Sequence, residues 1–330
     1  PEHIKALAGA FSGLSPAVRR TVVPGTKDVT PAIELSARKE KSWLDGEETL
    51  VTVELDPPRG LDCKKIIASA KQLAAAGVSA INIADNPLAR VRLGNIALAS
   101  QIQQETGVEV IVHMTGRDRN LIGLHSDLMG AHLLGIRNVL AVTGDPVSLS
   151  GEAGATSVFD VNSIGLLELL SALNRGQTLY GQELGAPTQF VLGAAFNPNA
   201  AQLDGQIRKL DKKVEAGAQF VQTQPVYAVA VMEKMLTAVE SDIPLLLGIL
   251  PLVSERNAEF LHNEVPGIQL PDDVRQRMQG KSGDAGVAEG MAIAREIVDA
   301  GRGRADGFYL MPPFGKVELA LELLEYIRQG

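Results

Sequence analysis

The chain has 330 residues, of which 45% are hydrophobic and 21% charged, which is typical of a globular protein with one large domain or two ordinary domains. A formal net charge of -8 without any Lys/Arg cluster disfavours nucleic-acid binding, and no apolar run approaches the length of a membrane span. The single cysteine, Cys63, excludes an internal disulfide framework and a multi-cysteine metal site. Because no signal peptide is recognisable either, we expect a cytoplasmic protein.

The first 45 residues are predicted to lie outside the main domain. Residues 1–11, PEHIKALAGAF, have the pattern of a short amphipathic helix, and residues 12–48 are turn-rich and charged, which is typical of a linker. The chain opens in the middle of a helical pattern without an initiator Met, so we expect a piece of a longer protein. We therefore divide the chain into a segment of residues 1–45 and a domain of residues 46–330.

Apolar, β-branched runs from Leu50 onward predict eight buried strands, at residues 50–55, 80–85, 109–115, 138–145, 188–196, 220–226, 244–252 and 307–313. Helical patterns lie between them, with longer gaps after the fourth and seventh runs. This alternation predicts a (β/α)8 TIM barrel. The rival is a doubly wound open sheet, whose G-x-G-x-x-G sequence is missing after the first strand, where the chain reads DPPRGLD.

Polar side chains at the ends of the predicted strands are the candidate site, because a barrel places its active site at the carboxyl ends of its strands. No strand ends in a lysine placed for a Schiff base, and the histidines and carboxylates that a catalytic metal needs are not grouped, so no metal is predicted. The remaining acids, amides and single histidine suit the binding of a polar heterocycle and the transfer of one proton. They predict a bound organic cofactor that supplies the harder chemistry.

Each candidate also has a structural interpretation, and the residues alone leave both open. Glu54 could pair with an arginine inside the barrel, and His113 could be a hydrogen-bonded core histidine. The TGDP sequence at 143–146 could be only a turn, Gln224 only a barrel-lining amide, and Lys212-Lys213 a solvated helix face.

Six motifs in order resemble the methylenetetrahydrofolate reductase family: VELDPP, VIVHMTGRDRN, VLAVTGDP, LDKKVEAGAQFVQTQPVY, LLLGILPL and GFYLMPPFGK. The resemblance extends from Leu50 to about Gly330 and is strongest to the reductase half of bifunctional proteins that carry a homocysteine S-methyltransferase domain in front. Residues 1–11 are similar to the sequence that follows the zinc-binding Cys-Cys motif of that domain. The resemblance implies that residues 1–45 are a remnant of it plus a linker, without its cysteines.

The resemblance also implies a reaction. FAD would bind at the mouth of the barrel, NADH or NADPH would reduce it and leave, and 5,10-methylenetetrahydrofolate would then accept the hydride to give 5-methyltetrahydrofolate. The implied partners are these small molecules, a methyltransferase domain and possible further copies of the chain, with no nucleic acid or membrane.

The family's site residues carry over by position. Glu54 corresponds to the general acid that protonates the departing folate nitrogen, and Asp145 to the aspartate that tunes the flavin and orients the pterin. Gln224 corresponds to the amide that binds the pterin. The implied cofactor contacts are Ala84, His113, Thr143, Gly144, Asp145, Phe159, Ala195, Asn197, Lys209 and Lys213. For Lys213 the resemblance favours a contact with the FAD phosphate over a solvated position.

The chain departs from the family in three places: Thr143 stands where many members have arginine, Pro225-Val226-Tyr227 stands where the family has an aromatic run after the pterin-binding glutamine, and MPPF replaces an arginine at the end of the last strand. Two other functions remain open. One is a flavin-free, pterin-binding barrel that transfers a methyl group, with Asp85, Asn86 and Asp145 lining its site. The other is a folate-binding half that is active only with a partner domain.

Overall fold

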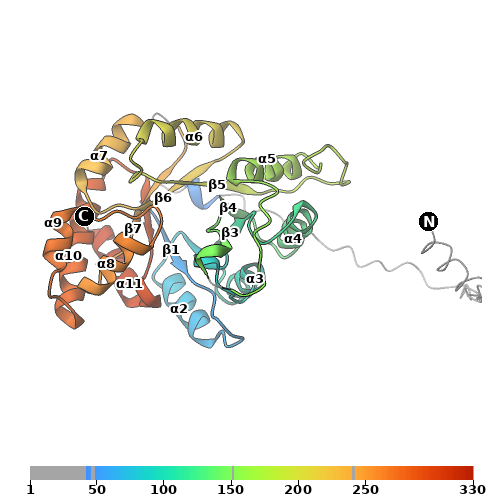
Figure 1. Ribbon diagram of the computed structural model, residues 1–330. Helices are drawn as coiled ribbons and strands as arrows, with labels where there is room; N and C mark the ends of the chain where they lie inside the picture. The colour runs from blue at the N-terminus through green and yellow to red at the C-terminus, as the bar shows by residue number, and fades with distance from the viewer. Residues whose placement is uncertain (1–41, 46–48, 151, 240–241, 330) are drawn as a thin grey trace, which may run out of the picture. The chain divides into compact units, whose positions relative to one another are not determined.

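The computed structural model describes residues 42–45, 49–150, 152–239 and 242–329 (Figure 1). The helix and most of the linker that we predict within residues 1–41 lie outside these residues. None of the helices in the described ranges is both long and apolar enough to cross a membrane.

Eight parallel strands form a closed barrel in chain order, and the last strand pairs with the first. Their bounds are β1 (Leu50–Leu55), β2 (Ala80–Ile83), β3 (Glu109–Thr115), β4 (Asn138–Val142), β5 (Val191–Phe196), β6 (Phe220–Pro225), β7 (Leu245–Ile249) and β8 (Gly307–Leu310). The predicted TIM barrel is thereby confirmed, and the open doubly wound sheet was the wrong alternative.

Helices surround the barrel (Figure 1). They are α2 (Lys64–Ala75), α3 (Asn95–Thr106), α4 (Leu121–Leu133), α5 (Ser163–Asn174), α6 (Leu203–Glu215), α7 (Val229–Ala238), α8 (Glu255–Glu264), α9 (Asp272–Met278), α10 (Gly283–Gly301) and α11 (Val317–Gln329). Short 3-10 turns are η1 (Trp43–Asp45), η2 (Pro87–Ala89), η3 (Val147–Leu149) and η4 (Pro313–Gly315). The two long gaps in the predicted pattern contain a long loop with η3 after β4 and the helices α8 and α9 after β7.

Side chains alternate between the two faces of each strand. On β1, Val51, Val53 and Leu55 are buried in the large core cluster that also includes apolar residues of the surrounding helices. With period two, Thr52 and Glu54 face the barrel interior. The alternation therefore places the Glu54 carboxyl in the barrel interior, while the outward-facing apolar side chains anchor the strand in the core.

The amino-terminal end of the barrel interior is filled by apolar side chains. Trp43 packs edge-on against Phe220, with ring centroids 5.2 Å apart, and its indole Nε1 donates a hydrogen bond to Asn138 Oδ1 at 3.0 Å. Gly193 leaves the space that Phe220 needs, because a Cβ there would lie 2.3 Å from Phe220 Cζ. These contacts close the bottom of the barrel and place Trp43 with the barrel unit. The interior is thus open to a ligand at the carboxyl ends of the strands.

Candidate active site

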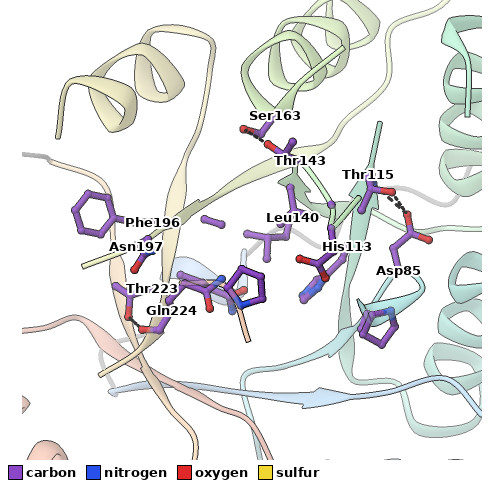
Figure 2. Close-up of a pocket in the computed structure, with 18 of the residues that line it drawn as sticks. Asp85, His113, Thr115, Leu140, Thr143, Ser163, Phe196, Asn197, Thr223 and Gln224 are labelled. Atoms are coloured by element: carbon purple, nitrogen blue, oxygen red, sulfur yellow. Dashed lines mark hydrogen bonds between the residues drawn. The ribbon is translucent and has the colours of Figure 1, made fainter. Parts of the chain in front are cut away.

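A cavity of about 480 Å³ lies at the carboxyl ends of the barrel strands (Figure 2). Ten of the twelve site residues predicted from the sequence line it: Glu54, Ala84, His113, Thr143, Gly144, Asp145, Ala195, Asn197, Lys213 and Gln224. Figure 2 shows Asn197 and Gln224 on one side of the cavity and His113 on the other. Residues far apart in the sequence therefore meet around one space, as the strand ends of a barrel require.

Glu54 is the acid of this cavity. Its side chain is 22% exposed, and the Tyr309 hydroxyl donates a hydrogen bond to its Oε2. Burial, and second the negative charge of Asp56, raise the pKa of Glu54 to about 8. Glu54 is therefore mostly protonated at neutral pH. The structural alternative required an arginine partner, whereas the partner that the described residues provide is a phenol.

His113 lies beside Glu54 and is neutral. It is 8% exposed, its Nε2 is 3.2 Å from Asn82 Oδ1 and 3.9 Å from Glu54 Oε2, and its carbonyl accepts a hydrogen bond from the Asn95 side chain at 2.6 Å. Burial lowers the pKa of His113 to about 4, although the charge of Asp85 opposes the shift. The ring thus offers hydrogen-bonding nitrogens to the cavity without adding a charge.

The turn after β4 brings its backbone close to β3. Gly144 has a φ of +88°, and a Cβ there would lie 3.0 Å from Thr115 Cβ, so both the conformation and the space favour glycine. The neighbouring Thr143 Oγ1 is 3.4 Å from Ser163 Oγ, and the Asp145 carbonyl accepts a hydrogen bond from Arg117 at 3.4 Å. The TGDP sequence is therefore a tight turn and also part of the cavity wall.

Arg117 is a buried cation in the cavity wall. No role was assigned to it from the sequence. It is 1% exposed, and its Nε and Nη2 donate to the two carboxylate oxygens of Asp118, each at 2.6 Å. Its Nη2 also donates to the Asp85 carbonyl at 3.3 Å. Since Arg117 also reaches the Asp145 carbonyl, it ties the ends of β2, β3 and β4 together.

Asp85 has a structural role. Its Oδ2 accepts hydrogen bonds from the Thr115 backbone amide and hydroxyl, both at 3.1 Å, and Arg119 donates to both of its carboxylate oxygens, at 2.8 and 3.3 Å. Asn86 does not line the cavity, and its side chain donates instead to Asp118 at 3.2 Å. The flavin-free alternative drew on Asp85 and Asn86, and neither is a free ligand group in this arrangement.

Lys213 reaches the cavity from α6. Its Nζ donates a hydrogen bond to the Ala195 carbonyl at 2.6 Å, and burial, and second the charge of Lys209, lower its pKa to about 8. The neighbouring Lys212 is exposed. The solvated-face interpretation of the Lys212-Lys213 pair therefore describes Lys212 and does not describe Lys213.

Two predicted cofactor contacts do not line the cavity. Lys209 is exposed one helical turn before Lys213, and its charge contributes to lowering the pKa of Lys213. Phe159 is 36% exposed, has a φ of 51°, and its backbone amide donates to the Gly116 carbonyl at 3.0 Å. Position along the chain placed both near the site, but their side chains are not part of its wall.

Several lining residues were missed from the sequence, and two of them, Tyr309 and Gln206, could have been found. Tyr309 lies on β8 two residues before Met311, and strand alternation from residue 307 would have placed both on the inward face. Gln206 lies seven residues before Lys213 on α6, which is two helical turns and the same helix face. In both cases the periodicity of the element was a usable signal.

Comparisons with known proteins show the family to which the chain belongs. A family profile described as methylenetetrahydrofolate reductase matches residues 39–311. Methylenetetrahydrofolate reductase 1 of Schizosaccharomyces pombe is 26% identical over 245 residues, which are 69% of this chain and 37% of that protein. Methylenetetrahydrofolate reductase (NADH) 1 of Arabidopsis thaliana is 24% identical over 245 residues, 69% of this chain and 40% of that protein. The chain thus spans 40% or less of the length of these curated relatives.

A solved structure shares the fold. It is an uncharacterized protein from Clostridium thermocellum that binds two copies of 5-methyl-5,6,7,8-tetrahydrofolic acid; the TM-score is 0.64 at 13% identity, over 87% of this chain and 98% of that one. The fold is shared at an identity too low to carry over residues. Because the family profile matches 39–311, which includes nearly all of the barrel, the chain belongs to the methylenetetrahydrofolate reductase family.

Proposed function

We propose that this barrel reduces 5,10-methylenetetrahydrofolate to 5-methyltetrahydrofolate, with FAD as the bound cofactor, NADH or NADPH as the hydride donor and Glu54 as the general acid. The observation that carries the proposal is a carboxyl group with a pKa of about 8 on the wall of the cavity at the carboxyl end of the barrel. Membership of the reductase family supports the choice of reaction.

The residues around the cavity fit a flavin. A volume of about 480 Å³ is in the usual range for small-molecule sites. The small side chains of Ala84 and Ala195 and the bare backbone of Gly144 allow a planar ring to approach closely. Lys213 offers a cation for the phosphate groups. When bound, FAD would supply the hydride transfer from the nicotinamide to the folate.

Glu54 would supply the proton that the folate reduction needs. The five-membered ring of the substrate opens when its carbon–nitrogen bond breaks, and the departing nitrogen must take up a proton. Glu54 is protonated at neutral pH and has a pKa near the working pH, which suits a general acid. The proton moves from the Glu54 carboxyl to that nitrogen and leaves a carboxylate, to which Tyr309 donates its hydrogen bond.

Other polar groups would bind and orient the ring systems. Gln224 lines the cavity on the side opposite His113 and offers an amide donor and acceptor to the pterin (Figure 2). Asp145 offers a carboxylate that can accept from pterin or flavin N–H groups. Asn197 has its Oδ1 engaged with the Asn199 backbone amide at 3.0 Å, which leaves its amino group to donate.

The organisation of the whole protein belongs to the same proposal. We infer that residues 1–45 are a remnant of a homocysteine methyltransferase domain plus a linker, and that residues 46–330 form the reductase domain in a cytoplasmic protein. The end of the linker, at Trp43, packs against Phe220 of the barrel. The start of the family match at residue 39 supports a boundary in this part of the chain. A methyltransferase domain and further copies of the chain are the proposed macromolecular partners.

The test is an anaerobic titration of the purified chain after incubation with FAD. We expect a yellow protein whose visible flavin absorbance is bleached by NADH or NADPH and restored by 5,10-methylenetetrahydrofolate, with one 5-methyltetrahydrofolate formed per flavin. A protein that binds 5-methyltetrahydrofolate but no FAD would contradict the proposal and favour the flavin-free barrel. A protein that turns over only after a methyltransferase domain is added would favour the folate-binding half.

A further inference from the structure

We propose that Tyr309 is a positioning residue that holds the carboxyl group of Glu54 in the cavity and sets the pH at which this group gives up its proton. The inference rests on the proposed role of Glu54 and adds a residue from the opposite end of the barrel sequence. The sequence motifs gave Tyr309 no role.

The geometry of two adjacent strands brings the pair together. Strands β1 and β8 pair in parallel with Thr52 opposite Tyr309, and Glu54 follows Thr52 on the same inward face. Tyr309 is 6% exposed, lines the cavity together with Glu54, and donates its hydroxyl hydrogen to Glu54 Oε2. The phenol is therefore fixed by the barrel wall, and its hydroxyl reaches the acid two residues further towards the carboxyl end of the neighbouring strand.

Tyr309 is the hydrogen-bond donor that the described residues supply to the Glu54 carboxyl. The other titratable groups around it are His113 on β3 and Asp56 just beyond β1. His113 Nε2 is 3.9 Å from Glu54 Oε2, beyond hydrogen-bonding distance, and is closer to Asn82 Oδ1 at 3.2 Å. Asp56 can only repel the ionised form of Glu54.

The ring of His113 also fixes the phenol. The two rings meet edge to face, with centroids 6.5 Å apart and planes at 69°. Asp85, the next carboxylate along the barrel rim, is engaged by Arg119 and does not compete for the Tyr309 hydroxyl. The orientation of Glu54 thus depends on one phenol, which is itself held by packing.

A phenol suits this task better than a cation. A lysine or arginine beside Glu54 would stabilise the carboxylate and remove the proton that the reaction needs. A neutral hydroxyl donates to the carboxyl group in both protonation states and more strongly to the carboxylate. Tyr309 therefore fixes the position of Glu54, leaves it protonated at neutral pH and moderates the effect of burial.

The test is Tyr309→Phe, which removes the hydroxyl and keeps the ring. Without the donor, Glu54 should titrate about one pH unit higher, because a hydrogen bond to the charged form is lost. Titration of 13C-labelled glutamate carboxyls by NMR measures this directly in the FAD-free and FAD-bound protein, with Glu54→Gln to assign the signal. The loss of reduced-flavin reoxidation by 5,10-methylenetetrahydrofolate at high pH should move by the same amount.

A rate change should accompany the shift. At pH values where Glu54 is fully protonated, folate-dependent reoxidation should fall about tenfold because the acid is no longer held in place, while flavin reduction by NAD(P)H changes less than about twofold. The matched control is Tyr227→Phe, which removes another buried hydroxyl, donating to the Leu250 carbonyl at 2.9 Å, without touching Glu54. This control should leave the Glu54 titration and both rates unchanged.

The outcomes separate the two proposals. An unchanged Glu54 titration in Tyr309→Phe would overturn the inference even in an active reductase. A shifted titration in a protein without reductase activity would support the positioning of Glu54 by Tyr309 and refute the proposed function. If Tyr309→Phe does not fold, fluorotyrosine at position 309 replaces it. As a stronger donor it should move the Glu54 titration to lower pH, and no movement would overturn the inference.

Discussion

Replacing Glu54 by glutamine should change how the stability of the folded protein depends on pH. In the folded protein the pKa of Glu54 is raised from 4.5 to about 8, first by burial and second by the Asp56 charge. Folding therefore requires the side chain to hold a proton that the unfolded chain has released at neutral pH. Because the folded state binds more protons in this range, its stability falls as the pH rises from about 4.5 to about 8.

The size of the effect follows from the pKa difference. A shift of the pKa from 4.5 to about 8 corresponds to a loss of about 3–5 kcal/mol in the free energy of unfolding. This loss is absent at the low end of the pH range and complete at its upper end. A glutamine has no proton to gain or lose and keeps an oxygen that can accept from the Tyr309 hydroxyl. Relative to wild type, Glu54→Gln should thus become progressively more stable as the pH rises through this window.

Urea unfolding of both proteins at intervals between pH 4.5 and 8 measures this difference. The slope of the free energy of unfolding against pH is compared between the two proteins, so a pH-independent change in stability caused by the glutamine amide does not affect the result. Asp56→Asn provides a check, because removing its charge should weaken the pH dependence of the wild-type protein. Parallel stability curves for wild type and Glu54→Gln would refute the raised pKa, and with it the reasoning that Glu54 carries a proton at neutral pH.

Three further predictions concern the cavity wall. Lys213→Ala should weaken FAD binding about tenfold, measured by flavin fluorescence quenching. The affinity of wild type for FAD should fall as the pH rises through about 8, because Lys213 then loses its charge. Lys212→Ala, on the exposed face, should bind FAD like wild type. Gly144→Ala should cost about 1–3 kcal/mol in urea unfolding because of its φ of +88° and the 3.0 Å contact with Thr115, and should cost more than Gly154→Ala, which has a φ of +79° but free space; equal costs would refute the contact. In wild type, His113 should lower the free energy of unfolding by about 3 kcal/mol as the pH falls from 6.5 to about 4, because the neutral folded histidine takes up a proton on unfolding. His113→Asn should remove this loss, and an unchanged acid unfolding curve would contradict the prediction.

The barrel was predictable because its strands are buried on both sides and separated by regular helical patterns. The ends of the strands were less predictable. The runs at 80–85 and 138–145 were extended too far, since β2 stops at Ile83 and β4 at Val142. The residues beyond these points, Asp85 and Gly144, belong to turns that are fixed by hydrogen bonds and close contacts from neighbouring strands. Such contacts connect distant parts of the chain and leave no local pattern.

The site residues divide in a similar way. The strand alternation that places Glu54 inward is visible in the sequence, but its partner Tyr309 comes from a strand 255 residues away. Lys209 and Lys213 are one helical turn apart, and only packing decides that Lys213 reaches the cavity. Arg117 is charged and adjacent to an acid, a pattern more often found at a surface than in a cavity wall.

The role of Glu54 as general acid is tested most directly by separating the two half-reactions in Glu54→Gln. Anaerobic stopped-flow absorbance follows flavin reduction by NAD(P)H and then reoxidation by 5,10-methylenetetrahydrofolate. We predict that flavin reduction stays within about twofold of wild type and that reoxidation slows by about 10²–10⁴, the usual contribution of a general acid. Equal losses in both half-reactions, or folate reduction at the wild-type rate, would contradict the assignment of the proton to Glu54.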